Sequence, residues 1–174
     1  VRPEWFSGEH PDAAGRPFRL WRQQADGLVQ FEECGGAFLP LPVGTGKEYL
    51  SLLCVKRAHV PTPHGRGIKR SLLIVPSHVF GKLVERDIPK ARRIFGWGDG
   101  DVPIAVHVLG GQPPARRRQV ARSGLPGLYC TTYALFQREQ ITEELEAIKP
   151  QLVVGNECHV LTNEFSPAAT KRRF

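Results

Sequence analysis

Continuous apolar runs alternate along this chain with stretches in which apolar residues recur every three or four positions. The continuous runs predict strands buried on both faces, and the helical spacing predicts amphipathic helices between them. The predicted strands are 71–75, 104–108, 128–131 and 151–154, with a shorter one at 37–39. The predicted helices are 18–29, 47–58, 77–95, 115–122 and 134–148, the third of which could break at Pro89. This alternation predicts a doubly wound α/β domain, with a mostly parallel sheet and helices on both faces.

The first 16 residues differ from the rest because they are rich in proline, glycine and charge. We expect them to form an arm or linker without a core of its own. Residues 17–174 are then one domain, a common size for a single hydrophobic core. Within it, the proline- and glycine-rich stretch 60–70 predicts a solvated loop.

Composition narrows the class of protein. The hydrophobic fraction is 41%, and no apolar run approaches the roughly 20 residues that span a bilayer. Lysine and arginine outnumber aspartate and glutamate by 24 to 17, so the net charge of +7 favours an anionic partner, most commonly nucleic acid. A basic protein without such a partner is the alternative.

No two of the four cysteines form a CxxC pair, which disfavours a zinc site and favours reduced core thiols in an intracellular protein.

A glycine-rich turn precedes the helix predicted at 47–58. It reads Gly44-Thr45-Gly46-Lys47 and follows the strand predicted at 37–39. Glycines let backbone amides point at phosphates, the helix N-terminus adds the positive end of its dipole, and a lysine supplies a point charge. These four residues predict a phosphate loop, although a glycine turn before a helix also occurs without a ligand. Glu48 stands where a complete motif has a magnesium-binding serine or threonine hydroxyl.

An acidic turn follows the last predicted strand, with the sequence Gly155-Asn156-Glu157-Cys158-His159. The carboxyl end of a core strand is where α/β proteins place their sites. A solvated turn with no ligand is the alternative for Glu157 and His159, and packing is the favoured role of Cys158.

In this acidic turn and the strand before it, the sequence resembles the superfamily 2 helicases and translocases, chiefly the chromatin-remodelling branch. Their second motif is Asp-Glu-x-His after an apolar strand, which resembles residues 151–163 here. Three further segments resemble their other motifs in the correct order: residues 18–25 the segment before the phosphate loop, 71–77 motif Ia, and 128–133 motif Ib. The resemblance implies a RecA-like ATP-binding lobe over about residues 18–165.

The resemblance also implies roles for matching residues. Lys47 would hold the phosphates of ATP together with Gly44, Thr45 and Gly46, and Glu157 would orient the attacking water. His159 would couple the nucleotide site to nucleic acid. Arg22 stands where the family has an adenine-binding glutamine. Its neighbour Gln23 is therefore the glutamine expected to contact adenine.

Both positions that would hold magnesium depart from the family. Glu48 replaces the hydroxyl, and Asn156 replaces the metal-binding aspartate with a neutral amide that is a poor ligand for a hard cation. Two departures at one ion predict weakened Mg²⁺ binding and impaired hydrolysis.

Nucleic acid, most readily DNA, is the partner that the resemblance implies. Pro76, Ser77, Thr131 and Thr132 would contact its backbone, which positions a strand without reading sequence. The basic runs 116–118 and 69–70 would add salt-sensitive attraction, or 116–118 is an ordinary solvated helix face.

Neither the family's third motif nor its second RecA-like lobe appears within the 174 residues. The missing lobe supplies an arginine finger worth roughly 10³–10⁵ in rate in related enzymes. We therefore expect this chain alone to be a poor ATPase, hydrolysing ATP only with a second lobe in cis or in trans. The alternative is a pseudo-ATPase that binds nucleic acid or a protein partner.

Overall fold

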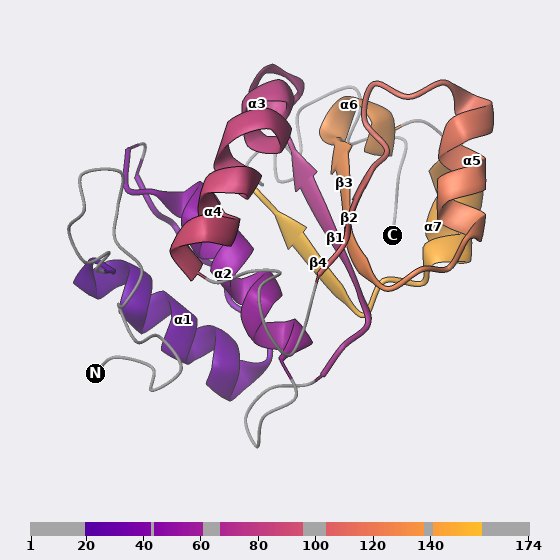
Figure 1. Cartoon of the computed structure of the whole chain (residues 1–174). Coiled ribbons are helices and arrows are strands. Elements are labelled where there is room, and N and C mark those ends of the chain that lie inside the picture. Colours follow the sequence, from indigo (N-terminus) through magenta and orange to yellow (C-terminus); the bar gives the residue numbers. More distant parts are fainter. Residues whose placement is uncertain (1–19, 43, 61–66, 96–103, 138–140, 158–174) are drawn as a thin grey trace. The chain divides into compact units, whose positions relative to one another are not determined.

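The computed structural model describes residues 20–42, 44–60, 67–95, 104–137 and 141–157 (Figure 1). The chain divides into two compact units, each with its own packing. The first comprises Val1–Lys69 and Lys82–Ala105, and the second comprises Arg70–Gly81 and Val106–Phe174. None of the described helices is both long enough and apolar enough to cross a membrane.

A four-stranded parallel sheet forms the centre of the second unit (Figure 1). Its strands are β1 (Arg70–Val75), β2 (Val106–Val108), β3 (Gly127–Thr132) and β4 (Leu152–Gly155), in the order β2-β3-β1-β4. Leu72 pairs with Tyr129 of β3 and with Val153 of β4. Because every pairing is parallel and helices flank the sheet, the predicted α/β class with a parallel sheet is confirmed.

Three strand predictions need correction. Residues 36–42 contain no strand, and the side chain of Phe38 is 69% exposed. Pro40 and Pro42 lack the N–H that a sheet ladder requires, and Leu39 instead packs beside Gly27 of the first helix. The other two corrections concern β2 and β4, which lie at the edges of the described sheet and are only partly buried. β2 is shorter than the predicted 104–108, and Val153 of β4 is 53% exposed.

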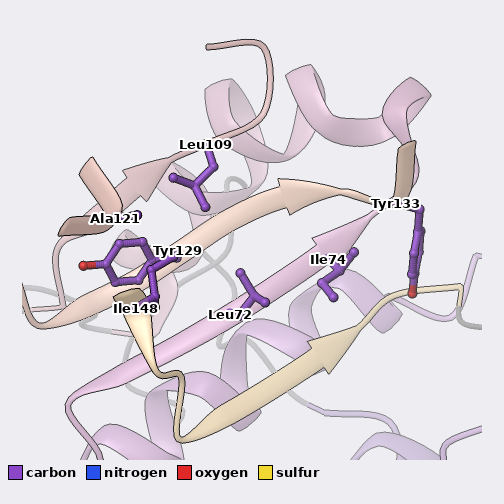
Figure 2. Packing of buried hydrophobic residues seen from close by; sticks show 7 residues of the cluster. All are labelled: Leu72, Ile74, Leu109, Ala121, Tyr129, Tyr133 and Ile148. Atoms are coloured by element: carbon purple, nitrogen blue, oxygen red, sulfur yellow. The ribbon is translucent and has the colours of Figure 1, made fainter. Parts of the chain in front are cut away.

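One face of the sheet carries an apolar cluster that joins strands to helices (Figure 2). The helices are α5 (Pro114–Arg122) and α7 (Thr142–Ile148), with the short α6 (Tyr133–Phe136) before α7. The single helix predicted over 134–148 is therefore two. The cluster consists of Leu72, Ile74, Leu109, Ala121, Tyr129, Tyr133 and Ile148. Each fully buried Leu or Ile side chain contributes roughly 1.5–3 kcal/mol of transfer free energy.

A buried ion pair joins α5 to α7 beside this cluster. Arg117 and Glu144 are 5% and 1% exposed, and Arg117 Nε lies 3.5 Å from Glu144 Oε1. Arg117 also donates from Nη1 to the carbonyl of Gln112 at 3.0 Å. The contact between the two charges is longer than a hydrogen bond, so mutual attraction in a dry setting holds them.

Three helical segments follow β1 without interruption: α3 (Ser77–Lys82), the π-helical η1 (Leu83–Asp87) and α4 (Ile88–Phe95). Pro89 cannot donate a backbone hydrogen bond, and just before it Ile88 N–H bonds the carbonyl of Leu83, five residues back. The predicted helix over 77–95 is thus confirmed, and the break expected at Pro89 is a widened helical turn just before it.

A buried carboxylate lies in this widened turn. The carboxylate of Asp87, 4% exposed, lies 3.1 Å from Arg86 Nε and 3.8 Å from Lys82 Nζ.

In the first unit, α1 (Arg22–Cys34) packs against α2 (Lys47–His59), and α2 packs against α4. Arg57 Nε donates to Glu32 Oε1 between α1 and α2. Lys56 Nζ donates to the carbonyl of Phe95 at the end of α4, where a cation meets the negative end of the helix dipole. Burial lowers the pKa of Lys56.

The thiols of Cys34, Cys54 and Cys130 are free. Cys54 and Cys130 are buried, and burial raises the pKa of each to about 12, as expected of core thiols. Cys34 is exposed at the end of α1, so the core expectation is wrong for it. Cys158 lies outside the described residues.

We predict that His59 makes the fold acid-sensitive. Burial lowers the pKa of this imidazole from 6.5 to about 4. Above pH 6.5 the ring is neutral in both states, whereas between about pH 6.5 and 4 the unfolded chain binds the proton more readily. The free energy of unfolding should therefore fall across this window, by at most about 3 kcal/mol. Urea unfolding at a series of pH values measures it. His59→Gln should flatten this slope and exposed His78→Gln should not; equal slopes in all three proteins would refute the assignment.

We predict that Glu144→Gln lowers the free energy of unfolding by about 3 kcal/mol, because it leaves the Arg117 guanidinium buried without its counter-charge. The matched control is Glu146→Gln on the exposed side of the same helix, expected to change stability by less than about 0.5 kcal/mol. Replacing both partners, as Arg117→Met with Glu144→Leu, should restore much of the loss. A cost as small as that of the control would rule out the ion pair as a stabilising contact.

Candidate functional site

The glycine turn at the start of α2 contains two left-handed glycines, although the strand expected before it at 37–39 is absent. Gly44 and Gly46 have φ of 84° and 71°, the left-handed region that other residues rarely adopt. Gly46 is the N-cap of α2, and Lys47 is its first residue. The Thr45 hydroxyl donates to the carbonyl of Pro42 at 2.6 Å, which closes the turn. A turn of this kind at the N-terminus of a 13-residue helix presents backbone N–H groups and the positive end of the dipole.

Gln24 ties this turn to α1, a contact that the sequence interpretation missed. Its Oε1 accepts from the backbone N–H of Trp21 at 2.9 Å, and its Nε2 donates to the carbonyl of Thr45 at 2.6 Å. The side chain is 5% exposed. The sequence did hold a signal, since Gln24 is the third residue of α1, the position whose side chain reaches back to cap a helix.

The two residues considered for contact with adenine, Gln23 and Arg22, are both exposed on α1. Gln23 is exposed on α1, and Arg22 lies 3.7 Å from Asp26 in an exposed pair one turn along the helix. Of these three neighbouring residues, Gln24 alone has a described hydrogen bond to the glycine turn. Adenine contact by Gln23 therefore stays a prediction.

Glu48 lies in the first turn of α2 and is partly exposed. A carboxylate is favourable at a helix N-terminus for the same electrostatic reason that a phosphate is. One turn later, the Ser51 hydroxyl donates to the carbonyl of Lys47 at 3.0 Å. Glu48 therefore places negative charge at the N-terminus of α2, where it would compete with a bound anion.

The carboxyl edge of the sheet gathers several of the other predicted residues. Pro76 and Ser77 follow β1, Thr131 and Thr132 end β3, and the acidic turn follows β4. The ladder extends past β4, because Asn156 N–H donates to the carbonyl of Ile74 at 2.9 Å. Parallel pairing of β1 with both neighbours brings these three segments to one edge of the second unit.

The acidic turn itself has unusual backbone geometry. Glu157 has a φ of 61°, a left-handed conformation that costs a non-glycine residue roughly 1–2 kcal/mol. Such strain is more common at functional sites than elsewhere. Asn156 is 5% exposed, and His159 lies outside the described residues.

The four residues expected to contact a nucleic-acid backbone differ in access. Ser77 is exposed at the start of α3, whereas Pro76 is buried. Thr131 is 0% exposed, and its hydroxyl has no hydrogen-bond partner among the described residues. The Thr132 hydroxyl accepts from Leu135 N–H at 3.2 Å and so caps α6. Of the four side chains, only Ser77 is open to a ligand.

The arginine run on α5 divides in the same way. Arg117 is committed to the buried pair with Glu144, whereas Arg116, Arg118 and Arg122 are exposed. Arg118 and Arg122 are one turn apart and repel each other. In the other basic run, Lys69 is exposed, and Arg70 donates from Nη1 to the carbonyl of Gly124 at 3.4 Å.

The donors expected for Mg²⁺ fit the ion only in part. Glu48 offers a carboxylate oxygen, which a hard cation accepts. Asn156 offers a neutral amide on a nearly buried side chain, without the charge of the aspartate that the family has. Across the described ranges, no three His, Cys, Asp or Glu side chains come together as a metal-binding group.

Comparison of the chain with protein-family models, with curated proteins and with solved structures finds no significant match. The helicase-like interpretation therefore depends on the ordered sequence motifs alone.

We predict that Gly46→Ala lowers the free energy of unfolding by at least about 1–2 kcal/mol, the cost of a left-handed conformation for a residue with a Cβ. The added Cβ would also lie 2.8 Å from Gln24 Nε2. Gly36→Ala is the matched control, because a Cβ there meets nothing within 4 Å. Urea unfolding of both variants measures the difference, and equal stabilities would contradict this conformation of the turn.

Proposed function

We propose that this chain binds a nucleoside triphosphate at Gly44–Lys47, as the ATP-binding lobe of a nucleic-acid helicase or translocase. The observation that carries the proposal is the left-handed glycine turn at the N-terminus of α2, followed directly by Lys47. Backbone amides and the helix dipole favour phosphate there, and the ammonium group adds a full charge. The parallel sheet and the order of the sequence motifs are consistent with this role.

By the resemblance, Lys47 of the first unit would hold the outer phosphates, and Glu157 of the second unit is the residue expected to orient the attacking water. His159 couples the nucleotide to nucleic acid. Hydrolysis needs a second RecA-like lobe in cis or in trans, because that lobe supplies the arginine finger. Mg²⁺ bound with the nucleotide would neutralise phosphate charge, and Glu48 in the first turn of α2 is a carboxylate that could hold it there.

The proposed nucleic-acid partner lies along the carboxyl edge of the sheet in an intracellular setting. Ser77 is the exposed side chain there, and the buried residues Pro76, Thr131 and Thr132 would act through their backbone. Exposed arginines of α5 add attraction that depends on salt. Contacts of this kind predict little sequence specificity.

A pseudo-ATPase is the second candidate, and the departures at Glu48 and Asn156 favour it. A neutral amide and a competing carboxylate would allow nucleotide binding while slowing hydrolysis. The discriminating measurement is ATP turnover by the protein together with its second lobe. Turnover that rises more than tenfold in Glu48→Thr with Asn156→Asp supports the pseudo-enzyme, and turnover already in the ordinary range of about 1–10³ s⁻¹ excludes it.

We predict that Lys47→Ala weakens ATP binding about 10- to 100-fold, because a charge-assisted phosphate contact contributes roughly 1.5–3 kcal/mol. Lys69→Ala removes the same charge from an exposed position and serves as the control. Isothermal titration calorimetry measures both affinities. Equal ATP affinity in the Lys47 and Lys69 variants would count against the phosphate loop.

A further inference from the structure

Three arginines on the outside of α5 have no acidic partner in the part of the chain that the structure describes. Arg116, Arg118 and Arg122 are exposed, in a helix that contains neither aspartate nor glutamate. Arg116 donates from Nη1 to Oε1 of Gln119 at 2.8 Å, and no described carboxylate forms an ion pair with any of the three guanidinium groups. Their charge is therefore directed to solvent or to a partner.

The neighbouring helix α7 does not neutralise these charges. It packs against α5 in the second unit (Figure 1), and its Glu144 is paired with the buried Arg117. Glu143 and Glu146 are exposed on α7, and within the described ranges neither pairs with an arginine of α5. The buried pair thus removes one arginine from the surface and leaves the other three.

The helix itself does not favour this concentration of charge. Arg116 is the third residue of α5, where the positive end of the helix dipole disfavours a cation. Arg118 and Arg122 are four residues apart on one side of the helix, where like charges repel. Only Arg122 has the last-turn position that favours a cation, which Arg92 and Arg93 both have in α4. Residues that oppose the local electrostatics of their helix are expected where function requires them.

The exposed side of α5 fits a polyanion better than a protein or a membrane. Its apolar residues Val120 and Ala121 pack into the cluster on the sheet, and no large apolar side chain is exposed on this helix. Protein interfaces have an apolar or aromatic centre, and helices that lie on membranes insert an apolar face. A nucleic-acid backbone requires neither, because arginine neutralises phosphates directly.

We propose that Arg116, Arg118 and Arg122 form an arginine face that binds the phosphate backbone of nucleic acid without bound nucleotide. The inference rests on the proposed function for the class of partner, and it adds a surface to the contacts expected at the carboxyl edge of the sheet. Each guanidinium neutralises one phosphate and releases its counterions, so affinity falls as salt rises. The contact positions the strand and reads no sequence.

The test measures the affinity of the intact chain for a fluorescently labelled DNA duplex, without nucleotide, between about 50 and 200 mM salt. Replacing all three arginines of the arginine face by glutamine should lower the slope of log affinity against log salt by about 2.7, which is about 0.9 for each phosphate contact. Binding at the lowest salt should weaken at least about tenfold. Replacing the same three by lysine keeps the charge and should keep the slope.

The matched control removes the same net charge from exposed positions of the first unit, as Lys69→Gln with Arg92→Gln and Arg93→Gln. It should lower the slope by less than the value of about 0.9 for one contact. Equal losses of slope in the two triple variants would show that net charge alone attracts the duplex, and would overturn the arginine face. The urea midpoint of the arginine-face glutamine variant should not fall. A lower midpoint would assign these arginines to stability and overturn the proposal.

The remaining outcomes separate this inference from the proposed function. An undiminished slope in the glutamine variant overturns the arginine face, while duplex binding by the unaltered chain keeps the nucleic-acid part of the proposed function. Competition by polyglutamate as effective as by unlabelled DNA of equal total charge would assign the face to acidic proteins and overturn a nucleic-acid partner. Failure of the unaltered chain to bind the duplex even at about 50 mM salt overturns both. The ATP affinity that Lys47→Ala tests is measured separately and stands or falls on its own.

Discussion

Parallel pairing of β1 with β3 on one side and β4 on the other is the constraint on which the second unit depends. Parallel strands of one sheet all end at the same edge, so the turns after them are gathered there whatever their separation in sequence. Ile74 pairs with Thr131 and with Gly155, and the next residue of that turn, Asn156, still bonds the Ile74 carbonyl. Glu157 therefore directly follows a residue that is still bonded to the sheet.

In the first unit, one side chain fixes the position of the glycine turn. Gln24 caps α1 and bonds the carbonyl of Thr45, so the helix and the glycine turn are positioned together. Both bonds are made by a nearly buried amide, where an unmade hydrogen bond would cost roughly 1–3 kcal/mol. Preorganisation of this kind would favour the phosphate binding proposed for this turn, because a ligand would not have to order the loop.

Charged residues in this protein serve two different purposes, and burial separates them. Arg117 and Arg57 are each paired with a glutamate inside their own unit, where they join one helix to the next. Arg116, Arg118 and Arg122 lie on the surface of α5. Each buried pair holds one positive and one negative charge, so the net charge of +7 is unchanged by them, and the exposed arginines of α5 are among the charges that can attract an anion.

The sequence by itself determined the elements whose cause is local. Unbroken apolar runs predicted all four strands of the sheet, proline placed the disturbance in the helix after β1, and two glycines before a lysine predicted the turn at Gly44–Lys47. The strand predicted at 37–39 is absent, and a short apolar run alone could not show whether another strand would pair with it.

Only the tertiary structure decided which side chains are exposed to a ligand and which are committed to contacts within the protein. Arg116, Arg117 and Arg118 are identical in sequence terms, yet the facing Glu144 on α7 makes Arg117 structural. Gln23 and Gln24 are adjacent and chemically the same, yet only Gln24 has a described bond to Thr45, because the 3.6-residue period of α1 turns neighbours to different sides. Burial and pairing depend on residues far away along the chain, which is why no local pattern could assign them.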